Sequence, residues 1–100
     1  MENIRELRKR IDEVDEEILR FLSKRAEICR SIGLVKDKHG IPIQDFPREN
    51  DVYAHIREKA LELGLDPYHV EAIYRQIVNM CSAVQIQKKK KLRNKNAMEN

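Results

Sequence analysis

Arg25 occupies a position where the surrounding pattern predicts a hydrophobic residue. From Ile4 to Val35, positions on one helix face follow each other in alternating steps of three and four residues. This is the spacing of a helix that packs against other helices. Nine of its ten positions are apolar, and the face reads Ile4, Leu7, Ile11, Val14, Ile18, Phe21, Arg25, Ile28, Ile32, Val35. A guanidinium buried there without an anion would cost several kcal/mol. We therefore expect either that the helix is exposed at Arg25 or that a negative group meets it.

Two further cations on the same helix bear on this choice. Lys36 lies within about 20° of the same face as Arg25 and roughly 16 Å further along the axis, so the two long side chains would leave a gap sized for one small ligand. Arg8 is about 25 Å from Arg25, too far to share a pocket within one chain. In a dimer with antiparallel long helices, the partner's Arg8 could reach the same pocket. Taken alone, Arg8 and Lys36 read as ordinary solvated residues. For Arg25 a structural role is the alternative, in which it pairs with a buried acid across a dimer.

Charged and amide side chains also occur at the start of the second helical segment and near the end of the third. Acids at a helix N-terminus are favoured by the backbone dipole, so capping explains Asp45 and Glu49. Arg48 in the same turn is unfavourable for the dipole, which favours a role in binding a ligand. Gln85 lies one turn beyond Cys81, and it becomes informative only as part of a set.

Three helices account for nearly all of the chain, which predicts an all-α fold. We expect them over residues 3–38, 47–63 and 67 to about 87, with Asn3 and Asp66 as N-caps and Gly64 ending the second. The first would span roughly 50 Å, whereas a compact domain of this size is about 35 Å across. Its own chain cannot cover that helix, so we expect a homodimer in which two long helices share a core.

Composition excludes several other classes of protein. Apolar runs are short and interrupted by charge, and no secretory signal is visible, so we expect a cytoplasmic protein without a membrane span. The histidines lack the spacing of metal ligands, and no metal is expected. Cys29 and Cys81 fall inside helical patterns and are expected to be buried free thiols.

The basic residues are concentrated at the C-terminal end. Residues 88–100 carry six Lys or Arg and one acid, so the +3 of the whole chain less the +5 of this segment leaves −2 for residues 1–87. We expect one domain over residues 1–87 and a disordered basic tail over 88–100. No aromatic residue stands among those lysines to stack on bases, so nucleic acid is not the expected partner.

The polar set resembles the all-helical (AroQ-type) chorismate mutases over residues 4–87. The site residues that carry the resemblance are Arg8, Arg25, Lys36, Asp45-x-x-Arg48-Glu49 and Gln85. The local stretches are Leu7-Arg8-x-x-Ile11-Asp12-x-x-Asp15, Ile41-Pro42-Ile43 and Arg48-Glu49. The resemblance implies an intertwined homodimer that converts chorismate to prephenate, a step toward phenylalanine and tyrosine. That intramolecular rearrangement of a dicarboxylate needs no cofactor, metal or nucleophile; it needs a restrained substrate and a stabilised ether oxygen.

The resemblance also implies a role for each polar residue. Arg25 and the partner's Arg8 would clamp the two carboxylates of chorismate. Lys36 and Gln85 would donate to the breaking ether oxygen, which makes Arg25, Lys36 and Gln85 the expected catalytic residues. Because an amide does not titrate, Gln85 imposes no requirement for acidic pH.

The remaining expected contacts to chorismate lie on the other side of the site. Glu49 would accept a hydrogen bond from the ring hydroxyl, and Asp45 and Arg48 would shape that side. Cys81 is also expected to touch substrate, although the better-known bacterial members have serine there and a thiol is a weaker donor.

Two other functions remain open from the sequence. A related helical lyase removes pyruvate from isochorismate with many of the same cations, but Glu49 and Gln85 together favour the mutase. A non-catalytic dimerisation or nucleic-acid module using the basic tail would leave Arg25 unexplained.

Overall fold

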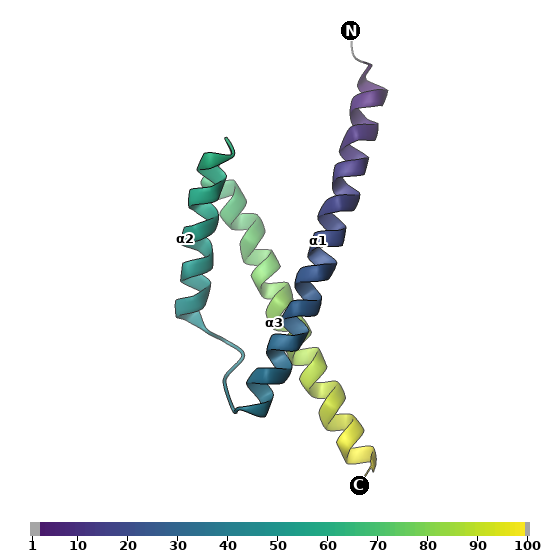
Figure 1. Ribbon diagram of the computed structural model, residues 1–100, viewed down its shortest axis with the longest axis vertical. Coiled ribbons are helices and arrows are strands. Elements are labelled where there is room, and N and C mark those ends of the chain that lie inside the picture. The colour runs from purple at the N-terminus through teal and green to yellow at the C-terminus, as the bar shows by residue number, and fades with distance from the viewer. Residues whose placement is uncertain (1–2, 100) are drawn as a thin grey trace.

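The chain folds into three helices, as the computed structural model shows (Figure 1). The description covers the backbone of residues 3–99 and the side chains of residues 3–87, 91 and 94–95. The helices are α1 (Ile4–Lys38), α2 (Phe46–Glu62) and α3 (Pro67–Glu99). No strand occurs within residues 3–99. The all-α prediction is confirmed, and each helix begins within a residue or two of where the sequence placed it.

Polar side chains fix where each helix begins. Asn3 Oδ1 accepts a hydrogen bond from the backbone N–H of Arg5 at 2.8 Å, and Asp45 Oδ1 accepts one from that of Arg48 at 3.0 Å. Asp66 Oδ1 accepts from the two N–H groups that follow it in α3, at 2.9 and 3.1 Å. These contacts satisfy backbone donors that lack a partner inside the helix. Through them, the backbone N–H groups of His69 and Tyr68 hold the pKa of the Asp66 carboxyl below its ordinary value.

Glycines in the left-handed region turn the chain after α1 and α2. Gly40 has φ 66° and Gly64 has φ 73°, conformations that residues with a Cβ rarely adopt. The backbone N–H of Leu65 then reaches back to the Ala60 carbonyl at 2.8 Å. The short turn sends α3 back along α2, so the two helices lie side by side (Figure 1).

α3 is the helix that holds the molecule together, because it packs against both α1 and α2. Glu71 of α3 bonds to Arg57 of α2 and to Arg75 one turn further along α3, and the Arg75 guanidinium lies 4.4 Å from the centre of the Tyr53 ring. The two guanidinium groups, Arg57 first, hold the pKa of the Glu71 carboxyl below its ordinary value. This cluster ties the middle of α2 to the first turns of α3.

The chain is elongated and buries little. Its dimensions are 67 × 30 × 15 Å and its radius of gyration is 17.9 Å, against about 13 Å for a compact domain of this length. The N-terminal half of α1 diverges from the other two helices, and only its end extends beyond them (Figure 1). Its apolar face is solvent-exposed, including Ile11 at 59%, Val14 at 57% and Phe21 at 65%. Among the residues whose side chains are described, the buried hydrophobic ones are Ala26, Cys29, Tyr53, Ala60 and Val78.

The C-terminal boundary of α3 differs from the sequence-based expectation. We expected helix 3 to fray at the lysine run after residue 87, whereas the helix continues to Glu99. Lys, Arg, Leu, Ala and Met are all good helix formers, so local propensity supports the continuation. The division into a domain over residues 1–87 and a separate tail stays a prediction. Among the residues described, no helix combines the length and apolar character that crossing a membrane requires.

Candidate active site

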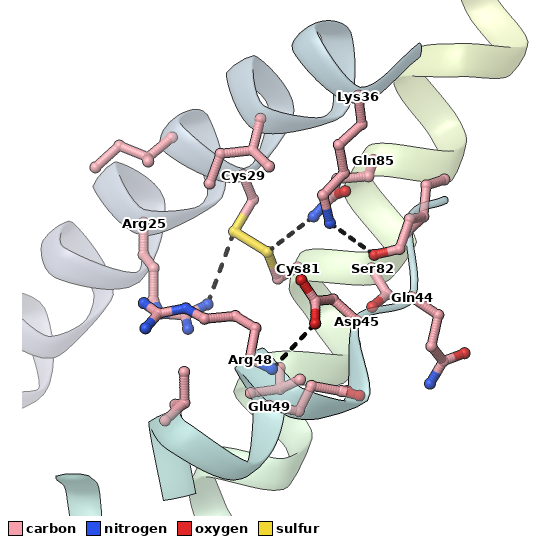
Figure 2. A pocket seen from close by; sticks show the side chains of 15 residues that line it. Arg25, Cys29, Lys36, Gln44, Asp45, Arg48, Glu49, Cys81, Ser82 and Gln85 are labelled. Atoms are coloured by element: carbon pink, nitrogen blue, oxygen red, sulfur yellow. Dashed lines mark hydrogen bonds between the residues drawn. A yellow bond between two sulfur atoms is a disulfide. The ribbon is translucent and has the colours of Figure 1, made fainter. Parts of the chain in front are cut away.

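A pocket of about 420 Å³ lies where α1 crosses α3, closed on its third side by the start of α2 (Figure 2). Seven of the eight predicted site residues line it. They are Arg25, Lys36, Asp45, Arg48, Glu49, Cys81 and Gln85. The aliphatic wall is formed by Ile28, Ile32, Ile43, Val52 and Val78. The pocket therefore combines an apolar lining with a few polar groups, as small-molecule sites do.

Arg25 enters the pocket from α1 and is half-buried. Its Nη1 lies 3.7 Å from Cys29 Sγ, which is a weak acceptor. Within the part of the chain that is described, Arg25 has no salt bridge of the kind that Arg20 forms with Glu16 and Glu17. In the view of Figure 2 its guanidinium and that of Arg48 point toward the same side of the pocket. The positive charge in the hydrophobic face is thus left available to a ligand.

Lys36 holds the loop before α2 against the end of α1. Its Nζ donates a hydrogen bond to the Ile43 carbonyl at 2.8 Å, and the side chain is half-buried. An ammonium has three N–H donors, so two remain for other acceptors. Lys36 is therefore anchored in position while still able to donate into the pocket.

The start of α2 supplies both a cap and pocket charges. Asp45 caps the helix through the Arg48 backbone, as the sequence predicted, and its carboxylate also lines the pocket. The Arg48 side chain is exposed, whereas Glu49 is half-buried beside it. Because Glu49 can accept hydrogen bonds, this side of the pocket offers an acceptor among the cations.

Gln85 is the most deeply buried polar side chain among the described residues, at 4% exposed. Its Nε2 donates to Cys81 Sγ at 3.3 Å. Its Oε1 is buried and has no hydrogen-bond partner among the described residues. A buried amide with unused hydrogen-bonding capacity in a pocket wall is suited to binding a ligand.

The expectation that Cys29 and Cys81 are free thiols is wrong. They form a disulfide between α1 and α3, with their Cα atoms 5.4 Å apart and a separation of 52 positions in the sequence. Each cysteine follows its own helical pattern, and nothing local indicates that the helices cross at these two positions. Since its sulfur carries no proton in this state, Cys81 cannot donate the hydrogen bond to substrate that we expected.

The comparisons with known proteins identify the family of this chain. Residues 7–86 match the family model for chorismate mutase type II. The chain belongs to this family. The resemblance seen in the sequence is confirmed, and the family is one of isomerases.

Relatives of this chain include stand-alone and fused chorismate mutases. A chorismate mutase from Methanocaldococcus jannaschii is 32% identical over 96% of this chain and 97% of its own length. A bifunctional chorismate mutase/prephenate dehydratase from Aquifex aeolicus is 39% identical over 85% of this chain, which spans only 24% of that protein. A solved structure of a conserved hypothetical protein from Pyrococcus furiosus is 32% identical, with a TM-score of 0.64 over 82% of this chain and 93% of that one.

Ser82 is a pocket residue that the sequence reading missed. It lines the same pocket, is half-buried, and lies three residues before Gln85 on α3. Its hydroxyl can donate and accept hydrogen bonds, unlike the bridged sulfur of Cys81. Its position beside Cys81, and one turn from Gln85, was the signal that could have identified it.

Arg8 is the predicted site residue that does not lie in the pocket. It is exposed near the start of α1, beside a shallow depression that Asn3, Arg5 and Asp12 also line. Arg8 and Arg25 are separated by about 25 Å along the axis of α1, so the two side chains do not meet within one chain. His39, His55 and His69 are exposed, and no group of three or more metal-binding side chains occurs in the described part of the chain.

Proposed function

We propose that this chain catalyses the rearrangement of chorismate to prephenate in aromatic amino acid biosynthesis. The observation that carries the proposal is the pocket between α1, α2 and α3, which gathers three cations and a buried amide within about 420 Å³. Chorismate is a small dicarboxylate, and its two negative charges complement Arg25, Lys36 and Arg48. The pocket volume is in the usual range for small-molecule sites.

The rearrangement requires the substrate to be held in one compact conformer. A carboxylate bound to Arg25 and an apolar ring against Ile28 and Ile32 would restrict the rotations that separate the reacting carbons. In the transition state the breaking C–O bond leaves negative charge on the ether oxygen. Lys36 and Gln85 donate to that oxygen, and their contribution grows as the charge develops. No side chain has to form a covalent bond or transfer a proton.

The substrate's remaining polar groups are matched on the other walls. Glu49 accepts a hydrogen bond from the ring hydroxyl, with Asp45 and Arg48 on the same side. Because Cys81 is bridged, the neutral donor to a substrate carboxylate is the hydroxyl of Ser82, the next residue along α3. Ser82 would thus replace the contact that Cys81 cannot make, without adding a charge to the pocket.

A homodimer completes the pocket. The apolar face of α1 is exposed from Ile4 to Phe21, and the radius of gyration is that of a chain without a closed core. Packing two such helices antiparallel would bury these faces on each other. It would also carry the partner's Arg8 toward the pocket around Arg25, where it would bind the second carboxylate. The cytoplasmic location stays a prediction from the sequence.

The test is direct assay with separate substrates. Purified protein is incubated with chorismate without added cofactor, and products are identified by liquid chromatography and NMR. Loss of chorismate with formation of prephenate is expected. A parallel incubation with isochorismate should release no pyruvate. Pyruvate release from isochorismate without turnover of chorismate would identify the lyase instead and overturn the proposal.

A further inference from the structure

The crossing of α1 and α3 is fixed by two close contacts, one helical turn apart on both helices. The first is the Cys29–Cys81 disulfide. The second is Gly33 against Gln85, four residues later on each helix. A Cβ placed on Gly33 would lie 2.9 Å from Gln85 Cγ and 3.1 Å from Gln85 Cα. No side chain fits between these backbones, so the α1 backbone lies directly against Gln85.

The same two contacts enclose the Gln85 side chain from base to tip. Gly33 meets its Cα, Cβ and Cγ, and Cys81 Sγ accepts a hydrogen bond from its Nε2 at 3.3 Å. Figure 2 shows the Gln85 amide between Lys36 and the disulfide. An amide nitrogen carries two hydrogens, so one bond to sulfur leaves a second donor. The sulfur bond thereby restricts the rotation of the amide and the direction of that second N–H.

We propose that the Cys29–Cys81 disulfide and Gly33 are positioning elements that hold the Gln85 amide for its contact with substrate. The inference rests on the proposed function, which gives Gln85 that contact. The two cysteines and Gly33 act through Gln85, and they are positioning residues. The activity of this chain therefore depends on its redox state.

Reduction of the Cys29–Cys81 disulfide should reversibly release the Gln85 amide from its position. A dithiol such as dithiothreitol breaks the S–S bond, each cysteine sulfur gains a proton as a thiol, and the dithiol is oxidised to its cyclic disulfide. The helices are then no longer cross-linked beside Gln85, and the acceptor at Sγ is free to turn away. We expect kcat to fall about three- to tenfold, the factor that corresponds to one ordinary hydrogen bond. KM should change less, because Gln85 acts on charge that develops only in the transition state.

The experiment compares the oxidised protein with the same protein after dithiothreitol. Thiol titration should count no free thiol before treatment and two after it, and circular dichroism should show unchanged helix content. Reoxidation should restore kcat. Cys29→Ser should have the kcat of the reduced protein and no response to dithiothreitol, whereas Ser31→Ala, an exposed change on α1, should respond as the parent does.

The decisive control is the same comparison in Gln85→Ala. If the disulfide acts through Gln85, this variant has a low kcat that reduction does not lower further. If reduction lowered kcat by the same factor in Gln85→Ala and in the parent, the disulfide would act through general stability. That result would overturn the proposal. Two free thiols before reduction, or the same or higher kcat after it, would overturn it as well. Absence of chorismate turnover in both redox states would overturn the proposed function, and this inference with it.

Gly33→Ala provides a test that does not depend on thiol chemistry. The new methyl would displace Gln85 from α1, since one of the atoms it meets is backbone. We expect a lower kcat in the oxidised protein with the disulfide still formed. An unchanged kcat would show that Gly33 has no positioning role.

Discussion

Replacing Arg25 by alanine should separate activity from stability. Arg25 is half-buried and has no salt bridge among the described residues. Its removal therefore leaves none of their carboxylates without an ion-pair partner. The contact that is lost within the chain is the weak one to Cys29 Sγ at 3.7 Å. A half-buried charge without a partner lowers stability, so we expect the melting temperature of Arg25→Ala to be unchanged or higher than that of the parent.

The expected effect on turnover is large. A guanidinium that binds a carboxylate through two charge-assisted hydrogen bonds contributes about 3–4 kcal/mol, which corresponds to a loss of roughly 10²- to 10³-fold in kcat/KM. Steady-state kinetics with chorismate and thermal denaturation by circular dichroism measure both quantities on one preparation. Arg20→Ala is the matched control on the same helix, because the ion pairs of Arg20 are exposed and lie outside the pocket; it should retain full activity. Less than a tenfold loss in Arg25→Ala, or a loss explained by unfolding, would refute the role assigned to Arg25.

Three further predictions concern single residues. Gln85→Glu should be active only toward acidic pH, because a carboxyl donates a hydrogen bond only when protonated; a pH–rate profile unchanged from the parent would contradict the donor role. Ser82→Ala should raise KM for chorismate severalfold in the oxidised protein without changing helix content, whereas an unchanged KM would remove Ser82 from the site. Glu71→Gln should lower stability at neutral pH and have no effect in strong acid. The folded-state pKa of Glu71 is lowered by Arg57 and Arg75, so its stabilisation is present above the unfolded pKa and is lost as the pH falls through the folded one. Urea denaturation at several pH values measures this difference, and a stability loss that persists in acid would contradict it.

Local signals explain why the helices and much of the site could be predicted. Asn3, Asp45 and Asp66 each cap a helix through a donor two or three residues away, so their effect is contained in a short stretch of sequence. Arg25 and Lys36 share a face because both lie on one helix, which periodicity alone determines. Which of these residues share a helix face could be predicted without knowing how the helices pack.

What the sequence did not reveal depends on the crossing of α1 with α3. The disulfide joins residues 52 positions apart, and Gly33 contacts Gln85 across the same crossing. Each pair is determined by the crossing point and angle, which periodicity within one helix does not specify. In the sequence Gly33 reads as a weak helix former, whereas in the fold it is the residue that permits close approach. To place Arg8 in the site, the arrangement of a dimer must also be known, because its proposed position beside Arg25 is in the pocket of a second chain.

The central claim is that the pocket around Arg25 is completed by Arg8 of a second chain. Arg8→Ala and Arg25→Ala proteins should each form inactive homodimers. Unfolding an equal mixture and refolding it would produce heterodimers in which one of the two pockets has both arginines. We predict that the mixture regains about a quarter of the parent's chorismate mutase activity, since half of the dimers are mixed and each has one intact site. Activity no greater than the average of the two variants would contradict the claim.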